Sequence, residues 1–148
     1  MKRIVGVLAA VAAVAAGTQA SVAAASGGTA KLQLRMTRVG TILVNGQGRT
    51  IYVFTKDRRN RDACISIPGC RSVWPPLTTT GKAVAGKGVR AGLIGTLTIG
   101  HGVRQVTYAG HPLYTYVADG GPGDTFYVNF SQFGGHWPAL NAAGNEVK

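Results

Sequence analysis

The chain has 148 residues, enough for one domain with a substantial buried core. Its 16 Lys and Arg residues outweigh 5 Asp and Glu residues, which gives a net charge of +11. This basic excess attracts polyanions in general and says nothing about the fold. After the N-terminal region, no hydrophobic stretch approaches the roughly 20 residues of a membrane-spanning helix, which excludes a protein embedded through such helices.

The N-terminus has the pattern of a secretory signal peptide. Lys2 and Arg3 precede an almost wholly apolar run over residues 4–16, and small residues follow as far as Ala25. This succession of charge, apolar segment and small-residue cleavage site predicts a signal peptide over residues 1–25. The protein is therefore expected outside the cytoplasm.

The mature chain is expected to begin near Ser26, with cleavage after Ala20 or Ala24 as alternatives. We expect residues 26–33 to be disordered and residues 34–148 to form a single soluble domain. The first cysteine lies far downstream of these cleavage sites, so the sequence offers no cysteine for lipid attachment at a mature N-terminus.

The first predicted elements form a β-hairpin. Residues 41–44 are mostly apolar and lead into Asn45 and Gly46, a pair typical of tight hairpin turns. Residues 50–55 are rich in β-branched and aromatic side chains and supply the returning strand.

The segment after this hairpin is the most electropositive part of the chain. Without Lys2 and Arg3, 14 basic residues face 5 acidic ones, a net charge of +9. Six of these cations make up a candidate polyanion patch: Arg49, Lys56, Arg58, Arg59, Arg61 and Arg71. For an exported protein, the partners are cell-wall polymers, polysaccharide or acidic lipid head groups; the alternative is a solvated loop without a partner. No basic motif with interleaved aromatic residues favours nucleic acid.

The same segment contains both cysteines, Cys64 and Cys70. An oxidising compartment favours their pairing, and five intervening residues do not fit the C-x-x-C spacing of many redox and metal sites. We predict a structural disulfide that contributes about 2 kcal/mol.

The second half of the chain also predicts strands. Residues 92–99 suggest one or two short strands, and residues 105–108 lead through a turn at residues 109–110 into a strand over residues 113–117. Frequent glycines interrupt the chain, and no segment of the mature sequence has a sustained helical period. The fold class is therefore predicted to be all-β, with a compact antiparallel domain.

Two parts of the chain share the pattern Tyr-x-aromatic-x-x-Asp followed by Trp-Pro. The residues of the two copies are Tyr52, Phe54, Asp57 and Trp74, and then Tyr114, Tyr116, Asp119 and Trp137. Asp and Trp are 17 residues apart in the first copy and 18 in the second. The duplication predicts two repeats, at about residues 39–78 and 92–141, related by a pseudo-twofold axis.

These motifs resemble the Yx(F/W/Y)xxD signature of a bacterial secreted-repeat family, whose members are often labelled predicted lipoproteins of unknown function. Residues 40–44, 74–77, 110–114 and 122–125 are similar to further hallmarks of that family. The resemblance spans nearly the whole mature chain and implies a repeat fold, but no established activity. This sequence differs from the lipoprotein members because it lacks their lipidated cysteine.

The repeated residues favour a structural role. Residues two apart in a strand share a face, so each Tyr and the aromatic residue after it are expected in the core. Each Asp follows where a strand should end and is expected to accept backbone N–H bonds in a turn. Each Trp-Pro pair places a large apolar side chain at a rigid corner.

The alternative is a sugar-stacking platform in the second repeat, beside its long glycine-rich connection. The aromatic residues available for it are Tyr108, Tyr114, Tyr116, Phe126, Tyr127 and Trp137.

The sequence gives little support to metal binding or catalysis. The weak metal candidates His101, His111 and His136 match no established ligand spacing, so we predict neither a metal nor another cofactor. No nucleophile motif is present, and Asp57 and Asp119 are the only symmetric carboxylates. We expect no enzyme activity.

Together, these features predict a secreted cell-envelope protein: a non-enzymatic binding or structural module for an anionic or polysaccharide surface component. It would act through the basic loop and the aromatic residues of the second repeat. The alternative is a metal-linked or redox-associated exported protein that uses the three histidines and the aromatic pairs.

Overall fold

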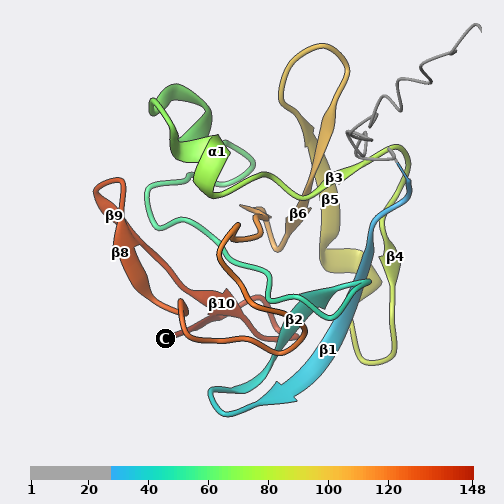
Figure 1. Cartoon of the computed structure of the whole chain (residues 1–148). Coiled ribbons are helices and arrows are strands. Elements are labelled where there is room, and N and C mark those ends of the chain that lie inside the picture. The colour runs from blue at the N-terminus through green and yellow to red at the C-terminus, as the bar shows by residue number, and fades with distance from the viewer. Residues whose placement is uncertain (1–27) are drawn as a thin grey trace, which may run out of the picture.

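The computed structural model describes residues 28–148, which form several small, mostly antiparallel sheets with almost no helix (Figure 1). The predicted signal peptide lies outside the described residues. In chain order, the strands are β1 (Lys31–Thr37), β2 (Gly40–Asn45), β3 (Thr78–Thr79), β4 (Val84–Ala85), β5 (Ile94–Thr98), β6 (Arg104–Tyr108), β7 (His111–Pro112), β8 (Phe130–Gln132), β9 (Gly135–Trp137), β10 (Ala139–Leu140) and β11 (Glu146–Val147). The helical turns are η1 (Cys64–Ser66), α1 (Cys70–Val73) and η2 (Ala91–Leu93). The all-β prediction is confirmed.

The strands are short and join into four sheets. One has the order β2-β1-β4 and another the order β3-β6-β5, with β7 also paired to β6. Strands β8 and β9 form a hairpin, and β10 pairs with β11. In Figure 1, the β5–β6 hairpin projects on the same side of the molecule as the loop that contains α1.

The N-terminal boundary differs from the prediction. Strand β1 begins at Lys31, inside the segment that the sequence assigned to disorder, and Leu32 is fully buried. Residues 31–33 are ordered because β1 pairs with β2 on one side and with β4 on the other. The sequence prediction overlooked this strand, although Leu32, Leu34 and Met36 alternate with polar residues in the period-two pattern of a half-buried strand.

The predicted first hairpin forms only next to its turn. Asn45 N–H donates to the Arg49 carbonyl at 2.9 Å and Ile51 N–H to the Leu43 carbonyl at 3.2 Å, on either side of a bridge between Val44 and Thr50. From Tyr52 onward the extended chain leaves β2, which pairs with β1, and bonds to the second repeat instead. The turn at Asn45 reverses the chain as the sequence predicts. The segment with which residues 52–55 pair, in contrast, is determined by contacts between residues that are distant in sequence.

A local twofold relation lies between Tyr52 and Tyr114. Each backbone N–H donates to the carbonyl oxygen of the other, both at 2.9 Å. On one flank, Val53 N–H donates to the Pro138 carbonyl at 2.9 Å. The equivalent bond on the other flank joins Thr115 N–H to the Pro75 carbonyl at 3.0 Å.

The tyrosine segment of each repeat therefore pairs with the Trp-Pro segment of the other. Neither repeat completes its own backbone hydrogen bonds, so the two halves depend on one another for folding.

The core consists of an aliphatic and an aromatic part. The fully buried side chains of the aliphatic part include Leu32, Leu43, Ile51, Val106, Leu113 and Leu140. The aromatic part holds Tyr52, Phe54, Trp74, Tyr114, Trp137 and both cysteines. Within residues 28–148, no helix has the length and apolar character needed to cross a membrane.

Candidate functional site

The centre of the molecule is a stack of aromatic rings that alternates between the repeats. In order, the rings are Phe54, Trp137, Trp74 and Tyr116. Neighbouring ring centroids are 4.2, 4.0 and 4.2 Å apart. The ring of Tyr52 meets Trp74 edge-on at 5.1 Å, and the ring of Tyr114 meets Trp137 in the same way at 5.2 Å. Stacked and edge-on pairs of this kind add stability beyond the area that they bury.

The repeated aspartates are joined to this cluster across the two repeats. The hydroxyl of Tyr52 donates to Oδ1 of Asp119 at 3.0 Å, and the hydroxyl of Tyr114 donates to Oδ2 of Asp57 at 3.0 Å. Each motif thus bonds to the other copy rather than to itself. The sequence prediction anticipated a turn-fixing role for the aspartates, but not this exchange.

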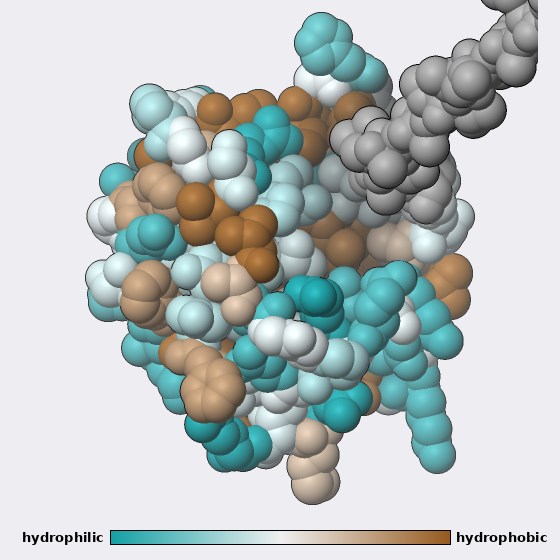
Figure 2. Space-filling view, viewed as in Figure 1, coloured by the Kyte–Doolittle hydropathy of each residue, from teal (hydrophilic) through white to brown (hydrophobic). Residues whose placement is uncertain are grey.

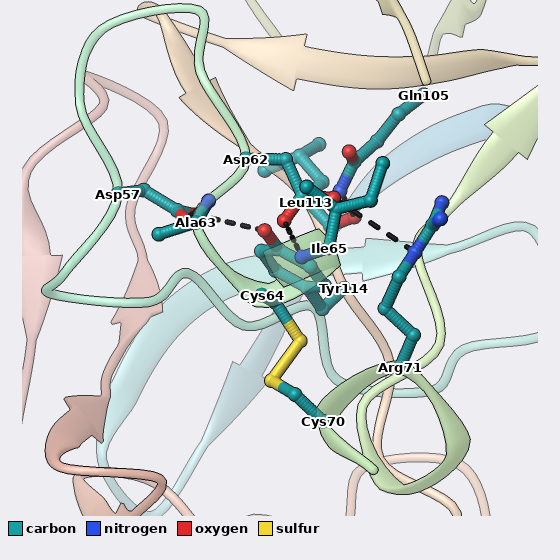
Figure 3. Close-up of polar contacts among 10 residues, drawn as sticks. All are labelled: Asp57, Asp62, Ala63, Cys64, Ile65, Cys70, Arg71, Gln105, Leu113 and Tyr114. Carbon is teal, nitrogen blue, oxygen red and sulfur yellow. Dashed lines mark hydrogen bonds and ion pairs between the residues drawn. A yellow bond between two sulfur atoms is a disulfide. The ribbon is translucent and has the colours of Figure 1, made fainter. Parts of the chain in front are cut away.

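The two aspartates differ in their second oxygen. Oδ1 of Asp57 accepts the Ala63 N–H at 2.7 Å, the kind of backbone bond that the sequence predicts (Figure 3). Oδ2 of Asp119 is buried and has no hydrogen-bond partner within residues 28–148. The turn-anchoring arrangement therefore exists in the first repeat alone.

Burial raises the pKa of both carboxyl groups. The pKa of Asp57 is raised to about 7, mainly by burial and further by the charge of Asp62, against the two hydrogen bonds that it accepts. The pKa of Asp119 is raised to about 6, again mainly by burial, with a contribution from Asp124. Burial and the adjacent carboxylates also raise the pKa values of the Tyr52 and Tyr114 hydroxyls.

The basic loop, residues 56–71, is held in a defined shape. Arg58 and Arg61 exchange backbone hydrogen bonds of 3.2 and 2.9 Å around a reverse turn, in which Asn60 adopts a φ of 54°. Asn60 N–H donates to the Gly110 carbonyl at 2.7 Å. The Cys64–Cys70 disulfide closes the C-terminal part of the loop, which confirms the predicted pairing.

The charges of this loop are sorted between its surface and the interior. Lys56, Arg58 and Arg61 are exposed, and none forms an ion pair with any described residue. Asp57 is bonded inward to Tyr114, and the side chain of Asp62 is almost wholly buried. The outer surface of the loop therefore carries positive charge that the acidic residues of the loop neutralise only weakly.

The other predicted patch residues have structural contacts. Arg59 donates to the Ala109 carbonyl at 3.2 Å, Arg49 to the Asp119 carbonyl at 3.1 Å, and Arg71 Nε lies 4.0 Å from Asp62 Oδ2. A Cβ atom at Gly110 would approach the Arg59 side chain to 2.7 Å, so the backbone there is shaped for this arginine. Arg59 is therefore exposed but bonded, whereas Arg49 and Arg71 are half-buried, which leaves Lys56, Arg58 and Arg61 as the exposed cations without such a contact.

Two open clefts border the basic loop. One, of about 220 Å³, is lined by Lys56, Arg58, Arg61, Asp62, Ala63 and Ser66. The other, of about 600 Å³, lies between residues 60–66 and residues 97–100. Arg61, Asp62 and Ser66 line both clefts.

The structure divides the aromatic residues of the sugar-stacking hypothesis. Tyr108, Tyr114 and Trp137 are fully buried, which removes them from any surface platform because a ligand cannot reach their rings. Phe126 is 74% exposed and lies beneath the guanidinium of Arg38, whose Cζ is 4.4 Å from the ring centroid. Tyr116 and Tyr127 are half-buried against each other, with ring centroids 4.4 Å apart.

The three histidines do not converge on a metal site. His101 is exposed at the tip of the β5–β6 hairpin, His111 lies in β7, and His136 is exposed in β9. Across residues 28–148, no group of three or more His, Cys, Asp or Glu side chains is placed to hold a metal ion.

A family model described as a secreted repeat of unknown function matches residues 34–78 and 95–141. The chain belongs to this family. The two matches cover more than half of the chain, and each contains one complete set of the repeated Tyr, Asp and Trp residues of the secreted-repeat pattern. No curated protein and no solved structure matches the chain.

Sequence reasoning missed the larger cleft. Its apolar wall comes from Ile65 on one side and from Leu97 and Ile99 on the other. These positions carried no motif, and residues more than 30 positions apart meet there only after folding. The exposure of Ile65 in an otherwise basic loop becomes informative once the cleft is known.

Proposed function

We propose that this secreted-repeat protein is a non-catalytic module that binds an anionic polysaccharide of the cell surface through its basic loop. It would act after removal of its signal peptide. The observation that carries the proposal is the sorting of charge in residues 56–71, where Lys56, Arg58 and Arg61 are exposed without ion pairs while the carboxylates turn inward. Such a field attracts polyanions and weakens as salt screens it.

The rigidity of the loop supports recognition of an extended partner. Backbone bonds at Arg58, Asn60 and Arg61, together with the disulfide, fix the loop before any ligand arrives. A loop that is already ordered loses less conformational entropy on binding.

The repeated carboxylates support a non-catalytic role. Asp57 and Asp119 each accept a tyrosine hydroxyl across the repeat boundary, which joins them to the aromatic core. Their raised pKa values follow from burial in this structural network, and networks of this kind perturb pKa values without any catalysis.

The proposal is tested by replacing two exposed cations of the loop. We expect Lys56→Gln with Arg58→Gln to weaken binding to immobilised polygalacturonate about tenfold at low ionic strength. Lys82→Gln with Lys87→Gln is the matched control, since both side chains lie elsewhere on the surface and the same charge is lost. The control should change the affinity by less than about twofold.

Salt provides the second arm of this test. The wild-type affinity should fall steeply between about 0.05 M and about 0.5 M salt. Equal losses in the two double variants, or an affinity that salt leaves unchanged, would remove the basic loop from the binding site.

A further inference from the structure

The larger cleft is a surface depression between two walls. One wall is the disulfide-bonded loop at residues 60–66, and the other is the end of β5 with the turn at residues 97–100. Figure 2 shows hydrophobic surface gathered between the regions of α1 and the β5–β6 hairpin. At about 600 Å³, the cleft is within the size range of small-molecule binding pockets.

A buried acceptor lies at this cleft. Asp62 is 7% exposed; its Oδ1 accepts the Ile65 N–H at 2.9 Å, while Oδ2 is buried and lacks a hydrogen bond within residues 28–148 (Figure 3). Arg71 Nε, a buried donor that also has no hydrogen-bond partner within residues 28–148, lies 4.0 Å from Oδ2, which is too long for a hydrogen bond. A buried carboxylate oxygen without a donor favours a ligand or solvent group that supplies one.

The rest of the cleft combines polar and apolar contacts. Arg61 supplies an exposed positive charge beside Asp62, and Asn60, Ser66 and Thr98 supply hydrogen-bonding side chains. Ile65 is 45% exposed. Together with Leu97 and Ile99, it forms an aliphatic surface.

We infer that this cleft binds an acidic sugar residue, with the sugar carboxylate at Arg61, a hydroxyl donating to Asp62 and the C–H face of the ring against Ile65. The inference deepens the proposed function and rests on it, since it names the unit of the anionic polysaccharide that the cleft recognises. A uronic acid carries these three features on one ring.

Asp62 gives the cleft a means of selection among polyanions. A chain of phosphate groups offers no hydroxyl hydrogen along its length and is repelled by the Asp62 carboxylate. A uronic acid presents hydroxyl donors beside its negative group and satisfies the same oxygen. The exposed cations attract any polyanion, whereas the cleft distinguishes among them.

The test compares two polyanions on one variant. Asp62→Asn keeps an oxygen for the Ile65 N–H, replaces the other acceptor by a donor and makes the protein more basic. We expect this variant to bind galacturonate oligomers at least tenfold more weakly than the wild type, while inorganic polyphosphate binds equally well or more tightly. Losses or gains of the same size for both polymers would overturn the inference.

A second variant keeps the inference testable if Asp62→Asn does not fold. Ile65→Ser changes an exposed side chain without altering charge or the backbone bond to Asp62. It should weaken galacturonate binding several-fold and leave polyphosphate binding unchanged; no change for galacturonate would contradict the proposed ring contact. If the wild type binds neither polymer, the proposed function fails as well, whereas binding of both with no effect of either variant overturns the cleft alone.

Discussion

In each repeat, one loop joins the repeated Asp to the repeated Trp. The two loops have the same residue types at their ends and different amino-acid compositions between them. Residues 58–73 contain four arginines, one aspartate and the disulfide, and they follow turns and short helices. Residues 120–136 contain one aspartate, no Lys, Arg or Cys, and the β8–β9 hairpin with its aromatic residues. The repeat has therefore kept its anchoring residues while the segment between them varies.

The comparison separates the core of the fold from its surfaces. The anchoring residues are interdependent because each tyrosine bonds to the aspartate of the other repeat. A change in one copy therefore damages both halves. The loops lack this constraint, so each can acquire its own charge and chemistry.

The largest effect is expected from the two tryptophans, where the repeats are most alike. Trp74→Ala and Trp137→Ala should each cost about 3–5 kcal/mol, because both side chains are fully buried and stacked on one another. Urea unfolding followed by far-UV circular dichroism measures both. Phe126→Ala, at an exposed aromatic, is the control and should cost less than about 1 kcal/mol. A loss near the control value for either tryptophan would show that the two repeats do not contribute equally to the stability of the stack.

The next effect comes from the two buried carboxyl groups. The folded pKa is raised from 3.8 to about 7 at Asp57 and to about 6 at Asp119. At a pH between its unfolded and its folded pKa, each carboxyl group keeps its proton in the folded protein, whereas the unfolded chain has released it. The stabilisation is fully present below about pH 4 and is lost as the pH rises through about 6 and 7. A tenfold difference in proton affinity between the folded and unfolded states corresponds to about 1.4 kcal/mol, so a loss of a few kcal/mol is expected.

Thermal unfolding between about pH 8 and about pH 5 tests this sign, with a higher melting temperature on the acid side. Asp57→Asn mimics the protonated side chain and should flatten the upper part of the profile. Asp119→Asn should flatten the part near pH 6. A melting temperature that falls steadily with acid in the wild type would show that the buried carboxyl groups do not control its stability.

The crossed tyrosine bonds should reveal the asymmetry between the repeats. Tyr52→Phe removes the hydroxyl that Asp119 accepts and leaves that buried carboxylate without a partner, which should cost about 3 kcal/mol. Tyr114→Phe should cost less, about 1–2 kcal/mol, because Asp57 still accepts the Ala63 N–H. Denaturant unfolding at neutral pH measures the difference.

The bond between Tyr52 and Asp119 is checked by replacing both residues. Tyr52→Phe combined with Asp119→Leu should recover part of the stability lost in the single tyrosine variant, because no buried carboxylate then lacks a donor. Equal losses for Tyr52→Phe and Tyr114→Phe would show that the Ala63 bond does not protect Asp57.

Much of the fold follows from the sequence because its signals are local. Alternating apolar residues, glycine-rich turns and the duplicated motif predict an all-β repeat protein, and the spacing of Cys64 and Cys70 in an exported chain predicts the disulfide. The partner of residues 52–55 was not predictable in this way. Their pairing with Tyr114 and with residues 136–139 depends on contacts between the repeats, which no local turn signal specifies.

The candidate site shows the same division. The exposed cations form one continuous segment, so composition alone indicates a basic surface. The cleft beside it requires Ile65, Asp62 and Ile99 to meet from separate parts of the chain. The orphaned oxygen of Asp62 is a property of the folded structure, because only packing determines which donors reach it.

The most local of these effects is expected from the disulfide, which belongs to one loop only. Reduction of Cys64–Cys70 should cost about 2 kcal/mol, since it releases a short ring in the unfolded chain while the buried sulfur atoms keep their place beside the aromatic core. Hydrogen exchange should accelerate at amides of residues 58–73 and stay unchanged in residues 120–136. If reduction instead loosens both loops or abolishes the near-ultraviolet signal of the Trp74–Trp137 stack, the bridge supports the shared core, and the division between a common centre and independent loops would have to be redrawn.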